Sequence, residues 1–443
     1  MRPVPDAPTD QQCQAYHEEK KPTKRKKPGS DTMIITATHG NHLLEKGFFA
    51  DENLDFATRG VLGRAVHGAS EIGEVLATIG RIRHSSDWAP QWALTAQTVR
   101  READSAKAGG HLVSARSGYL RAATYWACVV DGLSTTNAEP ELLAAFRSHR
   151  DAWDAFIDCS RGAHLRLDIP YEDGCLPGYL LRPDASGDRR PTLIITNGSD
   201  GSISDLWTPT AGALDRGWNV LVYDGPGQQS MLFEQLTHFR PDWEAVLTPV
   251  VDALIARDDV DPTRLTGFGV SQAGYWLPRA LAFEHRLVGA VVDPGVVDVS
   301  ASWTRPLSGG MVRMLREGNR DKFDRDMRLA TKIPSLGRTL AWRSRPYQHT
   351  DWYDLYRTVM EYRLDAELAA QIRTPLLITA PDHEQFWPGQ SEQLAQLVPH
   401  AETISFTASE GADHHCQPLG RLLTENRVFN WLEELLDEPA RTP

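Results

Sequence analysis

Hydrophobic residues recur at helical spacing through the first third of the chain, over residues 41–160. Positions three and four residues apart are typical of amphipathic helices, whose apolar faces bury against one another. This stretch lacks the strict alternation that half-buried strands show, so the pattern predicts a helical N-terminal unit. Its apolar stripes include Leu62, Val66, Ile72, Leu76 and Ile79, then Leu112, Ala115, Tyr119, Ala122 and Trp126, and then Leu142, Phe146, Trp153 and Phe156.

The pattern changes near His164, where short apolar runs begin to alternate with amphipathic stretches. Continuous apolar runs are typical of strands covered on both faces. Their alternation with helices predicts an α/β fold, a mostly parallel, doubly wound sheet with helices on both sides. The predicted strands are His164–Ile169, Gly178–Arg182, Thr192–Thr196, Asn219–Tyr223, Arg264–Val270, Val288–Val292, Pro375–Ala380 and Glu402–Thr407, and a terminal helix is predicted from Leu419 to Leu436.

The alternation stops between Asp293 and Thr374, in a segment rich in arginine and aromatic residues. We expect a helical insertion after the sixth strand, placed over the carboxyl ends of the strands. A Pro- and Lys-rich start cannot bury a core. The predicted domains are a disordered basic extension at 1–32, a helical N-terminal cap at 33–163, a sheet domain at 164–437 with a lid insertion at about 300–370, and a tail at 438–443.

Composition narrows the classes of function. The 443 residues are 41% hydrophobic and 24% charged, an ordinary globular balance. The net charge of −12 gives no reason to expect nucleic-acid binding. The chain shows neither a signal-peptide pattern nor an apolar run long enough for a membrane span. Five cysteines without CxxC spacing favour a reducing compartment and argue against a metal site. We therefore expect a cytoplasmic protein without metal or cofactor.

The segment from Arg264 to Trp276 holds the strongest chemical signal, a short strand, a serine with small neighbours, and a helix. A serine hydroxyl is a weak nucleophile unless the backbone holds it exposed beside a base. A sharp strand-to-helix turn does this, and it needs small residues around the serine so that the chain can close. The sequence of this turn, Gly269-Val-Ser271-Gln-Ala-Gly274, predicts Ser271 as a nucleophile.

Two later loops supply candidates for the base and the acid that such a serine needs. The strand at 375–380 is followed by Asp382 and Glu384, and either carboxylate can orient an imidazole. The strand at 402–407 is followed by adjacent histidines, of which we favour His415 as the base over His414. The order of serine, acid and histidine is the one expected for this type of sheet.

Backbone donors are also needed where negative charge develops on the substrate oxygen. The N–H of Gln272, which follows the predicted nucleophile, is one candidate. The loop after the third predicted strand supplies the other, at Gly198 or Ser199. We read the Gly-Pro-Gly-Gln segment after the fourth strand as a structural turn beneath the site, because its spacing does not fit nucleotide binding.

Taken in order, these motifs resemble those of α/β-hydrolases with a helical N-terminal cap. The resemblance covers residues 40–437. Over this range the chain is similar to 2,6-dihydroxypseudooxynicotine hydrolase, the FrsA-like proteins and fungal polyketide-shortening hydrolases. Ala273 departs from the family pattern, which usually has glycine there. The motifs are Asn197-Gly-Ser-Asp-Gly201, Asp224-Gly-Pro-Gly-Gln228, Gly269-Val-Ser271-Gln-Ala-Gly274, Glu384-Gln-Phe-Trp-Pro-Gly-Gln390 and Glu410-Gly-Ala-Asp-His-His415.

The resemblance implies a substrate-binding role for Asp200, because the nicotine-pathway relative has an acidic residue in this loop that is implicated in carbon–carbon cleavage. An Asx turn that holds the loop is the structural alternative. We also expect Trp303 in the insertion and Tyr275 after the serine to line a roofed apolar pocket for a small molecule.

The expected function is that of a serine hydrolase acting on a small carbonyl compound, by cleavage of an ester, a thioester or the C–C bond of a β-diketone or polyketide-like substrate. Acyl transfer or cyclisation by the same three residues is an alternative, and so is a hydrolase-fold protein that binds without turnover. We expect a small-molecule substrate and no membrane or nucleic-acid partner. A homodimer is the oligomeric state that we consider for this protein.

Overall fold

The computed structural model describes residues 47–134, 136 and 139–437. The extension predicted at 1–32 and the tail predicted at 438–443 lie outside the described residues. From Asp51 onward the chain forms one compact unit, to which all elements described below belong.

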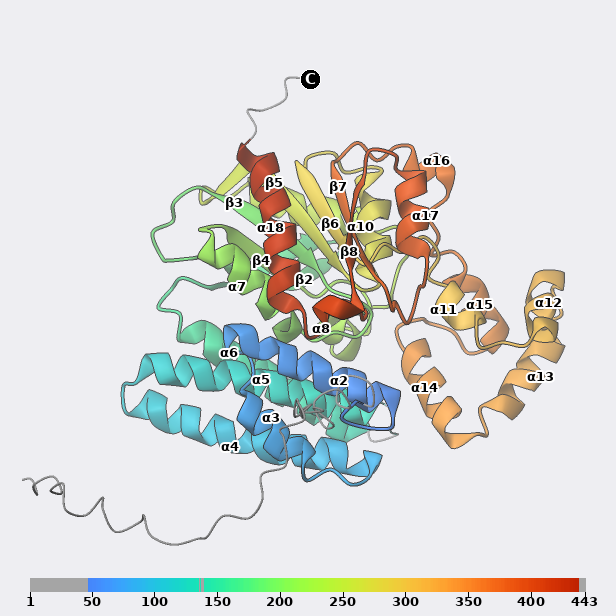
Figure 1. Cartoon of the computed structure of the whole chain (residues 1–443), viewed down its shortest axis with the longest axis horizontal. Helices are drawn as coiled ribbons and strands as arrows, with labels where there is room; N and C mark the ends of the chain where they lie inside the picture. Colours follow the sequence, from blue (N-terminus) through green and yellow to red (C-terminus); the bar gives the residue numbers. More distant parts are fainter. Residues whose placement is uncertain (1–46, 135, 137–138, 438–443) are drawn as a thin grey trace, which may run out of the picture. The chain divides into compact units, whose positions relative to one another are not determined.

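The centre of this unit is a single eight-stranded sheet with the order β1-β2-β4-β3-β5-β6-β7-β8 (Figure 1). Strands β1 and β2 form antiparallel pairs, and all later neighbours are parallel. The predicted fold class is therefore confirmed. The strands are β1 (Leu165–Tyr171), β2 (Gly174–Leu181), β3 (Arg190–Thr196), β4 (Asn219–Tyr223), β5 (Val260–Val270), β6 (Gly289–Asp293), β7 (Leu376–Pro381) and β8 (Glu402–Phe406).

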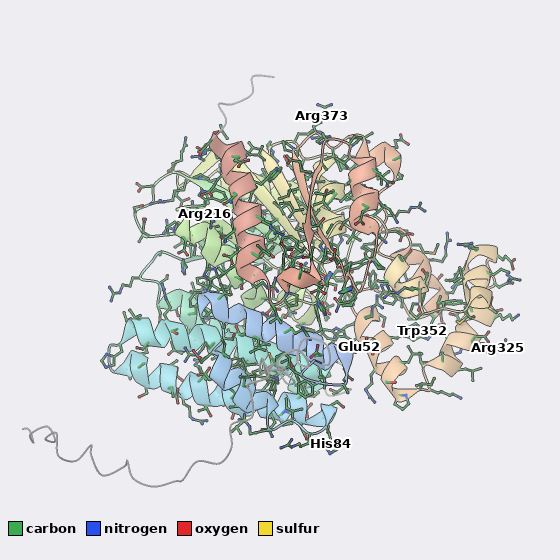
Figure 2. All side chains as sticks on the ribbon, viewed as in Figure 1. Glu52, His84, Arg216, Arg325, Trp352 and Arg373 are labelled. Carbon is green, nitrogen blue, oxygen red and sulfur yellow. The ribbon has the colours of Figure 1, made fainter. Side chains whose placement is uncertain are left out.

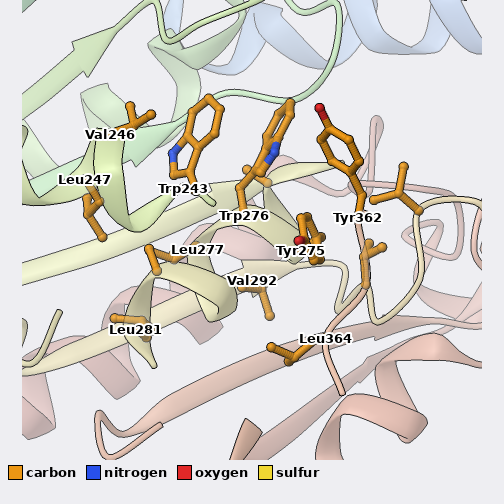
Figure 3. Packing of buried hydrophobic residues seen from close by; sticks show 14 of the residues in the cluster. Trp243, Val246, Leu247, Tyr275, Trp276, Leu277, Leu281, Val292, Tyr362 and Leu364 are labelled. Atoms are coloured by element: carbon orange, nitrogen blue, oxygen red, sulfur yellow. The ribbon is translucent and has the colours of Figure 1, made fainter. Parts of the chain in front are cut away.

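Helices cover both faces of the sheet, as continuous apolar strands require. Helix α18 packs against α7 and β6, whereas α9 packs against α10 and β5. Trp243 and Trp276 stack between α9 and α10 with ring centroids 4.3 Å apart (Figure 3). The helices are α7 (Trp207–Asp215), α8 (Gln229–Phe233), α9 (Glu244–Ile255), α10 (Ala273–Leu281), α17 (Gln390–Leu397) and α18 (Arg421–Asp437).

The N-terminal part of the unit is helical, as the apolar stripes predict. Successive helices α4, α5 and α6 pack side by side, and the short helix η1 (Arg64–His67) leads from α2 toward α7. Inside this bundle the indole N–H of Trp88 donates to the carbonyl of Cys128 at 2.8 Å. The helices are α2 (Glu52–Gly63), α3 (Ile72–Ile79), α4 (Trp88–Ala108), α5 (Leu112–Ser134) and α6 (Glu139–Asp158).

The insertion between β6 and β7 is helical, also as predicted (Figure 1). Its aromatic residues hold it together, since Trp303 packs edge-on against Tyr347 and Tyr356. Arg325 lies on its exposed surface (Figure 2). The helices are α11 (Ala301–Thr304), α12 (Gly309–Glu317), α13 (Arg320–Ala330), α14 (Pro334–Ser344), α15 (Trp352–Val359) and α16 (Ala366–Ala369).

A buried ion pair joins the helical N-terminal part to the sheet. Arg150 on α6 contacts the carboxylate of Asp224 in the turn after β4, and both side chains are largely buried. The same carboxylate accepts hydrogen bonds from the backbone and hydroxyl of Ser230. Removing one member of a buried pair leaves an uncompensated charge, which destabilises more than the pair itself stabilises.

We expect Arg150→Ala to lower the free energy of unfolding by about 3 kcal/mol or more, because Asp224 would remain buried without its cation. Arg147→Ala is the matched control on the same helix, since its pair with Glu234 is exposed and 3.8 Å long; it should cost less than about 1 kcal/mol. Urea unfolding of both variants measures the difference. Equal losses would contradict this account of the pair.

Candidate active site

Ser271 lies on a sharp turn between β5 and α10. Its φ angle is 57°, a left-handed conformation that is uncommon for residues other than glycine. Its N–H donates to the carbonyl of Asp293 at 2.7 Å, which ties the turn to the end of β6. The turn therefore presents the hydroxyl at the carboxyl edge of the sheet, where the motif predicts it.

Two glycines make this turn possible. A methyl group at Gly269 would lie 2.6 Å from the carbonyl oxygen of Ala273, and one at Gly274 would lie 1.9 Å from that of Pro294. Ala273 itself is fully buried, so the turn accommodates its methyl group. The departure from the family pattern at Ala273 is thus compatible with the turn.

The structure brings Ser271, His415 and Glu384 into one hydrogen-bonded chain. His415 Nε2 lies 2.9 Å from Ser271 Oγ, and His415 Nδ1 lies 2.8 Å from Glu384 Oε2. The other carboxylate oxygen of Glu384 accepts the N–H groups of Phe386 at 2.8 Å and Trp387 at 3.1 Å. The backbone of the loop after β7 therefore orients the carboxylate, and the carboxylate orients the ring.

The two alternative residues lie elsewhere. Asp382 is exposed, and its N–H donates to the carbonyl of Phe406 on β8. His414 turns its Nδ1 toward Asp413 Oδ1 at 3.2 Å, and the other oxygen of Asp413 contacts His383. Neither Asp382 nor His414 belongs to the chain that ends at the serine.

The charges of the histidine and the acid depend on each other. Burial of the His415 ring opposes its protonation, but the neighbouring Cys416 and Glu384 together outweigh burial and hold the pKa of His415 well above its ordinary value. Burial likewise disfavours the Glu384 carboxylate, yet His415 and the two backbone N–H groups bring the pKa of Glu384 below its usual range. Burial also raises the pKa of the neighbouring Cys416 thiol.

The loop after β3 approaches the serine closely. A methyl group at Gly198 would lie 2.8 Å from Ser271 Cβ, so only glycine fits there. The N–H of Gly198 donates to Asn197 Oδ1 at 2.8 Å and is not free for a ligand. Among the described residues, no acceptor receives the N–H of Ser199 or of Gln272. Of the predicted donors, Ser199 and Gln272 are therefore available and Gly198 contributes space.

Gln228 explains why this loop keeps its shape. Its side chain is buried, and its Nε2 donates to the carbonyls of Asn197 at 2.7 Å and Gly198 at 2.9 Å. Its Oε1 accepts the N–H of Gly225 at 2.8 Å. The turn after β4, predicted to be structural, thus supports the backbone beside Ser271.

A cavity of about 170 Å³ opens beside Ser271. Asp200 lines it, and Asp200 Oδ1 accepts the hydroxyl of Ser199 at 3.1 Å. The sequence analysis missed several other lining residues, because helices α2 and α18 and the short helix η1 carry them from both ends of the chain. They include Phe56, Arg64, Arg421 and Phe429.

The structure does not bring Trp303 or Tyr275 to this cavity. Trp303 is buried in the insertion, with the guanidinium of Arg343 over its ring at 4.3 Å. Tyr275 is a buried residue of α10, and its hydroxyl donates to the carbonyl of Pro241 at 3.1 Å. Both aromatic rings belong to the hydrophobic core, because apolar side chains on these helices pack inward against the sheet.

Two other aromatic rings pack beside the imidazole of His415. The ring centroid of Phe386 lies 4.7 Å from that of His415, and the ring centroid of Phe56 on α2 lies 6.2 Å from it.

Within the described ranges, no cluster of three or more His, Cys, Asp and Glu side chains is arranged to hold a metal ion. In the same ranges, no helix is both long and apolar enough to cross a bilayer.

An eight-stranded, mostly parallel sheet, a serine on the turn after β5, and an acid and a histidine after β7 and β8 define an α/β-hydrolase. No protein-family model matches the chain. Hydrolase LUC6 of a Fusarium species is 31% identical over 405 residues, which cover 84% of this chain and 94% of the relative. The chain belongs to the α/β-hydrolase family of this fungal protein and is an enzyme of the hydrolase type.

Further relatives agree with this assignment. The 20-hydroxy-prefusarin hydrolase FUS2 of Gibberella moniliformis is 29% identical over 366 residues, covering 77% of this chain and 84% of that protein. The crystal structure of 2,6-dihydroxy-pseudo-oxynicotine hydrolase has a TM-score of 0.67 at 18% identity, covering 85% of this chain and 95% of the other. At that identity the second likeness shows a shared fold, which includes the helical N-terminal part.

We expect Glu384→Gln to lower the pKa of His415, because the variant loses a carboxylate that favours the charged ring while burial, which disfavours it, remains. NMR titration of the His415 ring measures this change, and Asp382→Asn is the exposed control.

The raised pKa of His415 stabilises the fold fully below pH ~6.5 and ceases to do so as the pH rises through the pKa of folded His415. Because Glu384 must also be ionised, the stability lost in Glu384→Gln should be greatest between the ordinary pKa values of glutamate, about 4.3, and histidine, about 6.5. An unchanged His415 pKa would refute the coupling.

Proposed function

We propose that this enzyme is a serine hydrolase in which Ser271, His415 and Glu384 form the catalytic triad. The hydrogen-bonded chain from Glu384 through His415 to Ser271 Oγ is the observation that supports the proposal most directly. At a pH above the raised pKa of His415 the imidazole is neutral and can take the hydroxyl proton of Ser271, and the buried carboxylate stabilises the imidazolium that forms.

The reaction follows from these positions. Ser271 Oγ bonds to the substrate carbonyl carbon while His415 Nε2 takes the hydroxyl proton. The negative oxygen accepts hydrogen bonds from the N–H groups of Gln272 and Ser199, the predicted donors to which the described residues give no acceptor. His415 then gives the proton to the leaving group, and the bond to that group breaks. Water, deprotonated by His415, releases the acyl group and restores the serine.

The substrate we propose is a small carbonyl compound, an ester, a thioester or a β-diketone of polyketide type. The limited cavity beside Ser271 supports a small acyl group. A relative whose name assigns it to 20-hydroxy-prefusarin supports a small-molecule substrate. The position of Asp200 on the cavity wall supports a second role for a carboxylate, the handling of a proton during carbon–carbon cleavage.

A fluorophosphonate probe tests the triad. We expect rapid formation of a covalent adduct on Ser271, detected by mass spectrometry, and no adduct in Ser271→Ala. Glu384→Gln should slow labelling by about a thousandfold or more, because the imidazole loses its orienting partner. Asp382→Asn should label at close to the wild-type rate. Slow labelling of the wild-type protein would favour a binding protein over an enzyme with an activated serine.

The role of Asp200 is tested by comparing two substrates. If its carboxylate moves a proton in carbon–carbon cleavage, Asp200→Asn should lower kcat/KM for a linear β-diketone by about a hundredfold. The same variant should retain most activity on p-nitrophenyl acetate, whose leaving group needs no such help. Steady-state kinetics on both substrates decide the question, and equal losses would show that Asp200 only shapes the loop.

A further inference from the structure

We propose that Arg421, with Arg64 beside it, forms an anion-binding site in the wall of the cavity that Ser271 also lines, so that the substrate carries a two-oxygen monoanion. This site would name the substrate class of the proposed hydrolase. It rests on the proposed function, because a bound anion is a substrate only if the enzyme turns it over. A carboxylate and the enolate of a 1,3-diketone both have this chemistry, in which two oxygens share one negative charge.

Arg64 and Arg421 line the same cavity as Ser271 and His415. Arg64 begins the short helix η1 that follows α2, and Arg421 begins α18. A methyl group at Gly63 would come within 3.4 Å of the Arg421 side chain, so the two segments are in close contact.

The guanidinium of Arg421 has no ion pair within the described ranges, whereas the largely buried Arg150 and Arg182 contact Asp224 and Asp259. Its Nε atom and that of Arg64 are buried without a hydrogen-bond partner. A cation without a counter-ion is costly to hold in a partly buried cavity wall, so Arg421 points to an anionic ligand.

The acids of the same wall have other partners, beginning with Asp200, which accepts the hydroxyl of Ser199. Asp205 contacts Arg64 at 3.1 Å, and Glu425 contacts His67 at 2.8 Å. Asp293 accepts the hydroxyl of Thr379 and the amide of Gln417. Arg421 is the cation in this wall to which the described structure gives no anion.

The electrostatic environment of Arg421 also favours a bound counter-ion. Burial lowers the pKa of Arg421, while Cys416 and Asp293 act in the opposite direction. Burial also raises the pKa of Asp293, which weakens it as a counter-ion. Arginine keeps its proton in proteins, so the cost of its burial is best offset by a bound anion.

The chemistry of the guanidinium selects the ligand. Its planar fork of N–H donors matches two oxygens in one plane, as in a carboxylate or a 1,3-dicarbonyl enolate. Such an anion held by Arg421 would orient the rest of the substrate along the cavity, with its reactive carbonyl toward Ser271. An uncharged ester would lack this contact.

Binding to Ser271→Ala tests the proposal without turnover. Isothermal titration should show that phenylacetate binds at least about tenfold more tightly than phenylacetamide, its uncharged counterpart. Dimedone, a cyclic 1,3-diketone that ionises to an enolate, is compared with its O-methyl ether in the same way. Preference for the anion in either pair supports the proposal, and which pair shows it identifies the source. Preference in neither pair overturns it.

The arginine itself is tested in the Ser271→Ala background. Adding Arg421→Gln should abolish the preference for the anion, and Arg421→Lys should retain part of it. Arg427→Gln is the matched control, because Arg427 lies on the same helix and pairs with Glu410 outside the cavity. A preference that survives Arg421→Gln overturns the proposal.

A second readout separates binding from structural support. The melting temperature should stay unchanged or rise in Arg421→Gln, because the variant loses a buried cation without a partner. A lower melting temperature in both Arg421→Gln and Arg421→Lys would mean that Arg421 supports the fold and would overturn the proposal. Because these experiments need no catalysis, a failed fluorophosphonate reaction would refute the triad and leave this result standing.

Discussion

The left-handed turn at Ser271 is the constraint on which the rest of the site depends. A residue with a side chain stays in this conformation only when its surroundings hold it there. The carbonyl of Asp293 takes the N–H of the serine, and Gly198 leaves room for its side chain. Gln228 then fixes the loop that contains Gly198, and the neighbouring turn is tied to Arg150 on α6. A connected series of polar contacts therefore runs from the helical N-terminal part to the backbone beside the hydroxyl of Ser271.

Features that depend on local sequence were predictable. Apolar runs predicted all eight strands of the sheet, and the glycines around Ser271 predicted its turn, because each pattern lies within a dozen residues. The choice between Asp382 and Glu384 was not predictable from spacing. Both follow β7 within three residues, and only the path of the loop decides which carboxylate meets His415. That path is set by hydrogen bonds from backbone N–H groups, which every residue type except proline can supply.

Features that depend on distant segments were not predictable. The cavity wall combines Phe56 from α2, Arg64 from η1 and Arg421 from α18, and no periodicity relates positions so far apart. Aromatic residues were also ambiguous, since a ring that fills the core and a ring that lines a pocket look alike in a sequence. Trp303 and Tyr275 belong to the first kind. Polar residues carried more information here, because burying them requires a partner.

Phe56 gives the helical N-terminal part a share in the site, since this ring lies beside both Phe386 and His415. The imidazole is therefore enclosed by two segments more than three hundred positions apart in the sequence. Exchange of the N-terminal helices between members of the family would place a foreign surface against the base. The two parts of the chain should consequently diverge together during evolution, and recombination between them should be tolerated only where this aromatic contact is preserved.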